Sequence, residues 1–249
     1  MIRLKNETEI NKIKDSSAIL AETFKKLGAA VDEGITTGEL DHIAHSYITK
    51  CGATPAFLGY LDYPASICAS VNEIVIHGIP DEKKLRRGDI LSLDLGVDLS
   101  GYISDAAYTY TVGEVPEHTK QLLKVTEECL YRGIEKAKAG NRIHHISQAV
   151  YNHAKEHQYG VVHQFCGHGV GFELHEDPQV PNYAGRGPNP RIKAGMVLAI
   201  EPMINMGTDE VVVLEDDWTV MTVDSSLSAH FEHTIAVLPD RTEILTNFS

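Results

Sequence analysis

Five residues in this chain stand out because their side chains are ligands for divalent metal ions. They are four carboxylates and one imidazole: Asp94, Asp105, His168, Glu201 and Glu232. Four carboxylates that converged without a cation would repel one another strongly. One divalent ion would offset part of that charge and two would nearly balance it, and a pair of ions about 3.5–4 Å apart is a known hydrolytic arrangement. The oxygen-rich set, which has no cysteine, fits Mn, Fe(II) or Co better than structural Zn.

Two of these carboxylates lie at the ends of segments that have the same sequence pattern. Residues 85–94 read LRRGDILSLD and residues 192–201 read IKAGMVLAIE, so each apolar run starts at a glycine and ends on the acid. Such a run predicts a buried strand, and a carboxylate at its end is costly to bury unless it is paired, hydrogen-bonded or bound to metal. The repeat predicts two related halves, roughly 1–113 and 114–249, within one catalytic domain over 1–249.

The other three candidate ligands lie in segments that the pattern places near the same site. Asp105 is in the second strand of a hairpin that follows the strand over 89–96, which would bring it close to Asp94 on one face of the sheet. Glu232 lies in the strand-like run HFEHTIAVL. His168 lies in what reads as a glycine-rich turn, GHGVG, where small neighbours allow a ligand to approach closely.

Two further histidines have settings that indicate function. His77 lies in IHGIP, which is similar to the second-half GHGV, and His175 follows His168 in the same glycine-rich segment. Several of the 13 histidines read as helix-face or surface residues, namely His42, His45, His144, His145, His153 and His157. An imidazole beside a metal site can donate to a developing oxyanion or contact a leaving amine, and both residues are therefore candidates for that work.

Helix pairs that alternate with strand pairs would position these side chains. Periodicity and turn signals predict helices over 7–31, from Thr37 in a capped segment, over 117–138 and over 142–156, and strands over 74–76, 89–96, 102–112, 195–201, 210–223 and 230–238. Two helices followed by paired strands, twice over, indicate an internal duplication rather than an array of short repeats.

Composition restricts the binding partners and the cellular compartment that we expect for the chain. It has 249 residues with 22 basic and 35 acidic side chains, a net charge of −13, which disfavours nonspecific nucleic-acid binding. No stretch approaches the roughly 18 apolar residues of a membrane span, and the polar start MIRLKNETEI is unlike a signal peptide. The four cysteines show no CxxC spacing, so reduced thiols are expected. We expect a cytoplasmic monomer.

Five segments together resemble one family in order and spacing. SVNEIVIHGIP, DLGVDLSGYISDAA, GHGVGFELHEDPQVPNY, GMVLAIEPMI and SAHFEHTIAV are similar to the motifs of methionine aminopeptidases of the short bacterial type, type 1, and the likeness covers essentially the whole chain. The resemblance implies an α+β pita-bread fold, in which two pseudo-symmetric halves surround a curved antiparallel sheet with helices outside. It also implies two divalent metal ions, Co, Mn, Fe(II) or Zn.

The resemblance assigns roles to the candidate residues. Asp94 would chelate one ion, His168 and Glu201 the other, and Asp105 and Glu232 would bridge them. The implied reaction removes the initiator methionine of new polypeptides when the second residue is small, in transient proximity to the ribosome. Glu201 would also carry a proton to the leaving amine. Of the two substrate-contacting histidines, His175 would stabilise the oxyanion and His77 would orient the departing amide.

The family's methionine pocket matches a further set of side chains. By resemblance, its substrate-binding residues besides the two histidines are Phe57, Tyr60, Tyr63, Leu174 and Trp218. Phe57 departs from some members, which have Cys there, and its ring would narrow the pocket or stack on the thioether. His230 stands where Gln is common, and we interpret it as a packed side chain rather than as a modifier of Glu232.

Two rival functions remain open at the level of sequence. One is an aminopeptidase of the same fold that cleaves Xaa-Pro bonds, although that group usually carries a separate N-terminal domain. The other is a pita-bread protein that binds without catalysis, although such proteins are expected to have lost metal ligands. Only 31 residues separate Glu201 from Glu232, which leaves no room for the helical insertion of type 2 enzymes.

Overall fold

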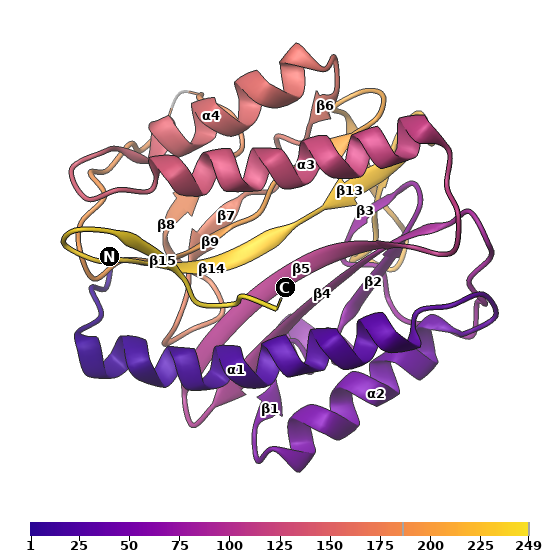
Figure 1. Ribbon diagram of the computed structural model, residues 1–249, viewed down its shortest axis with the longest axis horizontal. Coiled ribbons are helices and arrows are strands. Elements are labelled where there is room, and N and C mark those ends of the chain that lie inside the picture. The colour runs from indigo at the N-terminus through magenta and orange to yellow at the C-terminus, as the bar shows by residue number, and fades with distance from the viewer. Residues whose placement is uncertain (186, 249) are drawn as a thin grey trace.

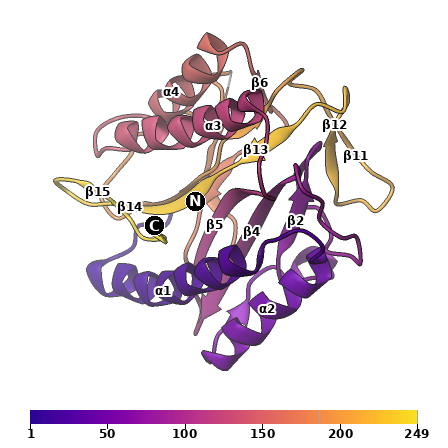
Figure 2. The same ribbon diagram turned by 45° about the vertical axis from the view of Figure 1, so that its right-hand side comes forward.

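A curved antiparallel sheet with four helices packed outside it forms the body of the protein (Figure 1). The computed structural model describes residues 1–185 and 187–248. The helices are α1 (Glu7–Ala30), α2 (Thr37–Lys50), α3 (Glu117–Lys136) and α4 (Ile143–Glu156). In both views α1 and α2 cover one half of the sheet and α3 and α4 the other, with β14 running between the pairs (Figures 1 and 2).

The first two helices begin at capping boxes. The Asn6 side chain accepts from the Glu9 backbone N–H, and the Glu9 side chain accepts from the Asn6 N–H in return. Thr36 and Glu39 make the same exchange at the start of α2. Each box satisfies two backbone donors that a helix start leaves free. The predicted start of α2 at Thr37 is confirmed, and the residue that caps it is Thr36.

The main sheet has nine strands and includes every strand that carries or adjoins a predicted metal ligand. Its order is β1-β4-β5-β14-β9-β7-β8, with β2 paired to β4 and β15 paired to β14. The strands are β1 (Thr54–Pro55), β2 (Cys68–Val71), β4 (Ile90–Leu99), β5 (Tyr102–Thr111), β7 (Gly167–Gly169), β8 (Glu176–Val180), β9 (Val197–Ile200), β14 (Glu232–Val237) and β15 (Thr242–Ile244).

Two smaller three-stranded sheets extend this body, and one of them carries substrate-site residues. One sheet joins β13 (Ser228–His230), β10 (Met203–Asn205) and β6 (Gly160–Val161). The other joins β11 (Val211–Val213), β12 (Val220–Thr222) and β3 (Ile74–Ile76). Figure 2 shows β11 and β12 at the end of the molecule away from β15. His77 directly follows β3 and Trp218 lies between β11 and β12.

The predicted elements differ from the observed ones in three respects that concern the site. Asp94 lies in the middle of β4 and does not end a strand, because β4 continues through Gly96 to Leu99. His168 lies in a strand, β7, rather than in a turn, because Gly167 and Gly169 pair with the neighbouring strands. The long strand predicted over 210–223 is a hairpin of two three-residue strands.

Each helix pair buries its apolar face against its own half of the sheet. Leu20, Phe24 and Leu40 pack with Leu93 under α1 and α2. An equivalent cluster under α3 and α4 contains Leu122, Val150, Leu198 and Ile235. Burying a side chain of this size stabilises the fold by about 1.5–3 kcal/mol. The two clusters hold the strands rigidly and leave the opposite face of the sheet for polar residues.

Two of the four cysteines are buried in the folded protein. All four cysteines are free thiols. Cys68 and Cys129 are buried, and burial raises the pKa of the Cys129 thiol to about 12. Among the described residues, no helix is long and apolar enough to cross a membrane.

Candidate metal and substrate site

The five predicted metal ligands come from five neighbouring strands of the main sheet. Asp94 is on β4, Asp105 on β5, Glu232 is the first residue of β14, Glu201 directly follows β9, and His168 is on β7. Those strands lie side by side in the order β4-β5-β14-β9-β7. Adjacent strands of an antiparallel sheet are about 4.7–4.9 Å apart, so five contiguous strands can converge their side chains on a small space where the sheet curves.

The register places the carboxylates on one face. Asp94 pairs with Ala107 of β5, and Ala107 pairs in turn with Glu232 of β14. Asp105 is two residues from Ala107 and pairs with Gly96. Positions two apart on a strand share a face, and directly paired residues also share it. All three carboxylates therefore point to the same side of the sheet.

Measured separations confirm that these groups converge. His168 Nε2 lies 3.3 Å from Glu201 Oε1 and 3.9 Å from Asp105 Oδ2. Ligand atoms of Asp105, His168 and Glu232 all lie within 4.8 Å of one another. The Nδ1 atom of His168 lies 3.0 Å from the carbonyl oxygen of Gly169. That bond fixes the tautomer with hydrogen on Nδ1 and leaves Nε2 as a lone-pair ligand.

The electrostatics of the cluster favour a bound cation. Burial raises the pKa of Asp105 to about 7, and burial together with the charge of Asp105 raises the pKa of Glu201 to about 8. Burial and neighbouring carboxylates also hold the pKa values of Asp94 and Glu232 well above their ordinary range. Each of three side chains keeps a buried oxygen without a hydrogen-bond partner: Asp94 Oδ1, Asp105 Oδ1 and Glu232 Oε1.

The imidazole in the cluster is also in the state that metal binding needs. Burial lowers the pKa of His168 to about 3, so its ring is neutral at physiological pH. A neutral imidazole and ionised carboxylates are the forms that ligate divalent metals. Bound cations would therefore have three effects. They would partner the buried carboxylate oxygens, offset the repulsion between the carboxylates and accept the free Nε2 of His168 as a ligand. The residues present fit a divalent metal centre.

His77 and His175 lie beside this cluster, on its open side. The ring centroids of His168 and His175 are 4.3 Å apart, and His175 Nδ1 lies 2.8 Å from the Tyr60 hydroxyl. His77 is packed edge-on against Phe165 and Trp218. Burial, with a smaller effect of His175, lowers the pKa of His77 to about 4. His77 therefore presents a neutral ring.

The backbone at His77 is held in an unusual conformation. Its φ is +58°, which a residue other than glycine rarely adopts. The next residue is Gly78, where an added Cβ would lie 2.4 Å from the Ala69 carbonyl oxygen, so only glycine fits. Strain of about 1–3 kcal/mol persists only where the surrounding structure fixes it, and it clusters at functional sites. The close approach to β2 aims the His77 ring into the cavity.

One cavity brings the metal ligands and the predicted substrate residues together. Its volume is about 180 Å³, the space of about six waters. Its wall contains every predicted site residue, namely Phe57, Tyr60, Tyr63, His77, Asp94, Asp105, His168, Leu174, His175, Glu201, Trp218 and Glu232. The carboxylates form one end and the apolar and aromatic side chains the other, so the cavity suits a small apolar group joined to a polar backbone.

The apolar end of the cavity is rigid. Tyr63 is 3 % exposed, donates its hydroxyl to two backbone carbonyls, and packs edge-on against Trp218 with ring centroids 4.9 Å apart. Gly96 makes room for the pocket, since a Cβ there would lie 3.1 Å from the Phe57 ring and 3.4 Å from Leu174. Phe57 and Leu174 are both buried. The pocket is formed by packed side chains on fixed backbone.

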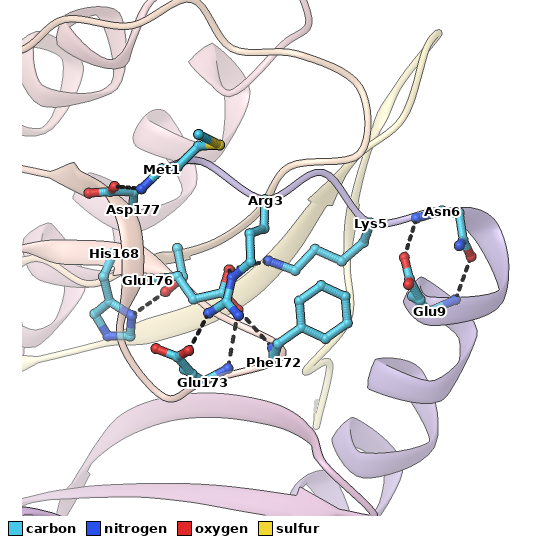
Figure 3. A network of polar contacts seen from close by, with 11 residues as sticks. Met1, Arg3, Lys5, Asn6, Glu9, His168, Phe172, Glu173, Glu176 and Asp177 are labelled. Carbon is cyan, nitrogen blue, oxygen red and sulfur yellow. Dashed lines mark hydrogen bonds and ion pairs between the residues drawn. The ribbon is translucent and has the colours of Figure 1, made fainter.

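A buried ion pair fixes the loop that carries Leu174 and His175 (Figure 3). The Glu176 carboxylate accepts from the backbone N–H groups of Phe172 and Glu173 at 2.7 and 3.1 Å, and from Lys5 Nζ at 2.6 Å. Arg3 Nε lies 3.4 Å from the same carboxylate. The side chains of Lys5 and Glu176 are each 1 % exposed. The N-terminal segment therefore ties down the loop beside the metal cluster.

Sequence reasoning missed Cys68, and it predicted His230 as a packed side chain without showing that it lies near Glu201. Cys68 lines the cavity because it pairs directly with Asp94 across β2 and β4, a register that no local motif reveals. His230 is buried with its Nε2 3.8 Å from Glu201 Oε2 and without a hydrogen-bond partner. Its position two residues before Glu232 was the available signal. The structure brings it close to Glu201 rather than leaving it in an unrelated packing site.

The fold and the carboxylate cluster define a class of metal-dependent hydrolase, and the comparisons agree. The sequence profile of metallopeptidase family M24 matches residues 11–239. The chain belongs to this family, whose members bind divalent metal.

Particular relatives carry a more specific name. The chain is 51% identical over 246 residues to a methionine aminopeptidase from Clostridium perfringens, covering 99% of each chain. It is 48% identical over 246 residues to methionine aminopeptidase 1 of Bacillus subtilis, again covering 99% of each. The crystal structure of methionine aminopeptidase from Rickettsia prowazekii superimposes with a TM-score of 0.97 at 39% identity, covering 99% of this chain and 100% of that one. The predicted pita-bread fold is confirmed by this likeness.

Proposed function

We propose that this protein is a methionine aminopeptidase that removes the initiator methionine of new polypeptides when the second residue is small. The observation that carries the proposal is the joint cavity, in which a carboxylate cluster suited to divalent metal meets a small, rigid, apolar pocket. Full-length relatives with that name support it. An Xaa-Pro aminopeptidase and a non-catalytic binder are disfavoured by the same relatives and by the complete set of ligands.

We propose that two divalent ions bind at Asp94, Asp105, His168, Glu201 and Glu232. Four carboxylates nearly balance two such charges, and the unpartnered oxygens of three of them support the assignment. Bound divalent ions supply Lewis acidity that polarises a carbonyl and lowers the pKa of a water. The protein's part is to hold its ligands in fixed positions on five adjacent strands, so that little reorganisation is needed during reaction.

Each of the remaining polar residues can be given a role at the scissile bond. His175 would donate to the oxyanion from Nε2, because its Nδ1 faces the Tyr60 hydroxyl at 2.8 Å. His77 would orient the amide of the departing chain, since its packed ring is held in place by Phe165 and Trp218. Glu201 would transfer a proton to the leaving amine, because its carboxylate stands at the metal cluster next to the scissile bond.

The apolar end of the cavity supports selection for methionine. Phe57, Tyr63, Leu174 and Trp218 would surround the unbranched side chain, and thioether sulfur makes favourable contacts with aromatic rings. A cavity volume of about 180 Å³ suits one side chain of this size. The enzyme would meet its substrates in the cytoplasm, close to the ribosome, where new chains first expose their N-termini.

Peptide hydrolysis tests this proposal. The purified protein, supplied separately with Mn(II), Co(II) and Fe(II), is expected to release methionine from Met-Ala-Ser, and a chelator is expected to abolish the release. Met-Leu-Ser and Ala-Pro-Ser serve as controls and should be cleaved poorly. Exclusive cleavage of the proline peptide would assign the Xaa-Pro reaction instead. Inactivity with every metal would favour the binding protein.

A further inference from the structure

A second group of side chains that could ligate a metal ion lies outside the cavity. It is carried by α3 and α4, the helix pair labelled in Figure 1. It consists of Glu128 on α3, His153 on α4 and His157 at the C-terminal end of α4. We propose that these three residues bind one zinc-type divalent ion that cross-links the two helices. The proposal is independent of the aminopeptidase activity, since none of the three residues lines the catalytic cavity.

The geometry needs little adjustment to close around an ion. Each residue offers a ligand atom, and these atoms all lie within 4.8 Å of one another. His153 and His157 are four residues apart, so they stand on one face of α4 across a single turn, with ring centroids 5.0 Å apart. His153 Nε2 already lies 2.7 Å from Glu128 Oε2 on the other helix.

Ordinary bond lengths set the size of the required movement. Zinc binds histidine nitrogen and carboxylate oxygen at about 2.0–2.2 Å, which places tetrahedral ligands roughly 3.4 Å apart. The Glu128–His153 pair must therefore open by less than 1 Å. His157 is exposed and Glu128 is half-buried, so both side chains can move. Two imidazoles and one carboxylate form a known zinc ligand set with room for a water.

A second observation distinguishes the three-residue group from an ordinary ion pair on the protein surface. The His153 side chain is only 5 % exposed, and its Nδ1 atom is buried without a hydrogen-bond partner. A simple Glu128–His153 hydrogen bond leaves that nitrogen unexplained. A metal-bound histidine usually donates a hydrogen bond from its second ring N–H to a nearby carboxylate, and Glu156 Oε2 lies 3.7 Å from this Nδ1. A small shift of Glu156 would complete that arrangement.

The charges around the group also favour a cation. Glu128 and Glu156 supply two carboxylates, and His157 stands where α4 ends, at the negative end of the helix dipole. Soft thiolates are absent from the group, and the nitrogen-rich set suits Zn(II), with Ni(II) and Cu(II) as competitors. An ion bound here would tie α3 to α4 in the folded state and stabilise it by mass action.

Calorimetric titration tests the site on the Mn(II)-activated enzyme. Zn(II) is added to the wild type, to His157→Ala, to Glu128→Gln and to His42→Ala, which removes an exposed imidazole from α2 as a matched control. Zinc that enters the catalytic cavity contributes equally to all four proteins, so the difference between them isolates the proposed site. His157 is exposed, so its replacement is expected to leave folding and methionine release unchanged.

The expected result is one additional zinc equivalent in the wild type and in His42→Ala. That equivalent should weaken at least tenfold in His157→Ala and Glu128→Gln. Saturating Zn(II) should also raise the melting temperature of the wild type by about 5 °C relative to His157→Ala. Equal zinc stoichiometry, affinity and melting shift in the wild type and His157→Ala would overturn the proposal.

Discussion

At the scale of single residues, Glu201 is the side chain on which the proposed chemistry depends most. It directly follows β9, lies 3.3 Å from His168 Nε2, and has a pKa raised to about 8. Glu201→Ala removes both a metal ligand and the proposed proton carrier, so kcat for methionine release should fall by about 10³-fold or more. Steady-state kinetics at saturating metal measure this. Glu210→Ala, an exposed acid, is the control, and a twofold loss in Glu201→Ala would refute the role.

Variants of His175 can distinguish an effect on substrate binding, seen in KM, from an effect on catalysis, seen in kcat. Loss of one oxyanion donor typically costs about 10²–10³ in rate, so His175→Ala should lower kcat by that amount with little change in KM. Tyr60→Phe removes only the hydroxyl that faces His175 Nδ1 at 2.8 Å, and a smaller loss is expected. His118→Ala, at an exposed position on α3, should retain full activity. An effect of His175→Ala on KM alone would assign the residue to substrate binding.

At the scale of elements, the N-terminal segment matters because it supports the His175 loop. Lys5→Met would leave the Glu176 carboxylate buried with Arg3 as its remaining cationic partner, at 3.4 Å. Breaking a buried pair costs about 3–5 kcal/mol, and the remaining arginine should reduce the loss in unfolding free energy to about 2–3 kcal/mol. Urea unfolding of Lys5→Met, Glu176→Gln and the double variant measures the coupling.

Two further results would test the interpretation of this pair. Lys25→Met, which breaks an exposed pair with Glu22, should cost less than about 1 kcal/mol. Strictly additive losses in the double variant would mean that Lys5 and Glu176 do not act together. The kcat of Lys5→Met should also fall, because the loop that carries His175 loses its buried lysine partner and is then held less firmly by the Arg3 pairs with Glu173 and Glu176.

Elements of different length were predictable from the sequence to different degrees. The four helices and the β4–β5 hairpin were found because they span 10 to 24 residues with clear periodicity. Strands β7, β8 and β10 have three to five residues and exist only through pairing with distant segments, so local patterns could not reveal them. The mid-strand position of Asp94 was missed for a related reason, since Gly96 reads as a strand end but makes room for Phe57 and Leu174.

The sequence predicts which residues line the site but not how they are arranged in space. Duplicated strands and family resemblance named the residues that the structure gathers in one cavity, and their catalytic roles remain proposals. Neither source gave the register that sets Cys68 opposite Asp94, or the approach of His230 to Glu201. Both depend on pairing and curvature of the sheet, which are tertiary properties. In the sequence, the histidines of the second cluster, on α3 and α4, are typical of helix-face or surface residues, and the glutamate beside them comes from another helix.

At the scale of the whole molecule, the two helix pairs and their separate cores hold the halves of the sheet around one shared charge cluster. We infer that internal duplication produced this arrangement, because each half contributes a helix pair and at least one ligand-bearing strand. Asp94 and Asp105 come from the first half, and His168, Glu201 and Glu232 from the second. Folding therefore brings carboxylates of both halves close together. Their repulsion and burial lower the unfolding free energy of the metal-free protein.

This cost predicts an unusual dependence of stability on pH. Burial raises the pKa values of Asp105 to about 7 and of Glu201 to about 8. A carboxyl group with a raised folded pKa holds its proton longer in the folded state, so its stabilisation is present at low pH and is lost as pH rises through that pKa. Buried His77, His168 and His230 have lowered pKa values and act oppositely, but only below about pH 6.5.

In the window from pH 7 to pH 8.2 the carboxylates therefore dominate the change in unfolding free energy. With a chelator present, the unfolding free energy should fall by about 1–2 kcal/mol across this window, since each retained proton contributes about 1.4 kcal/mol per pH unit. With saturating Mn(II), the ligands are deprotonated at both ends of the window, and the fall should disappear. Thermal unfolding of both forms measures the difference, and parallel curves would show that the buried carboxylates do not bind the added metal.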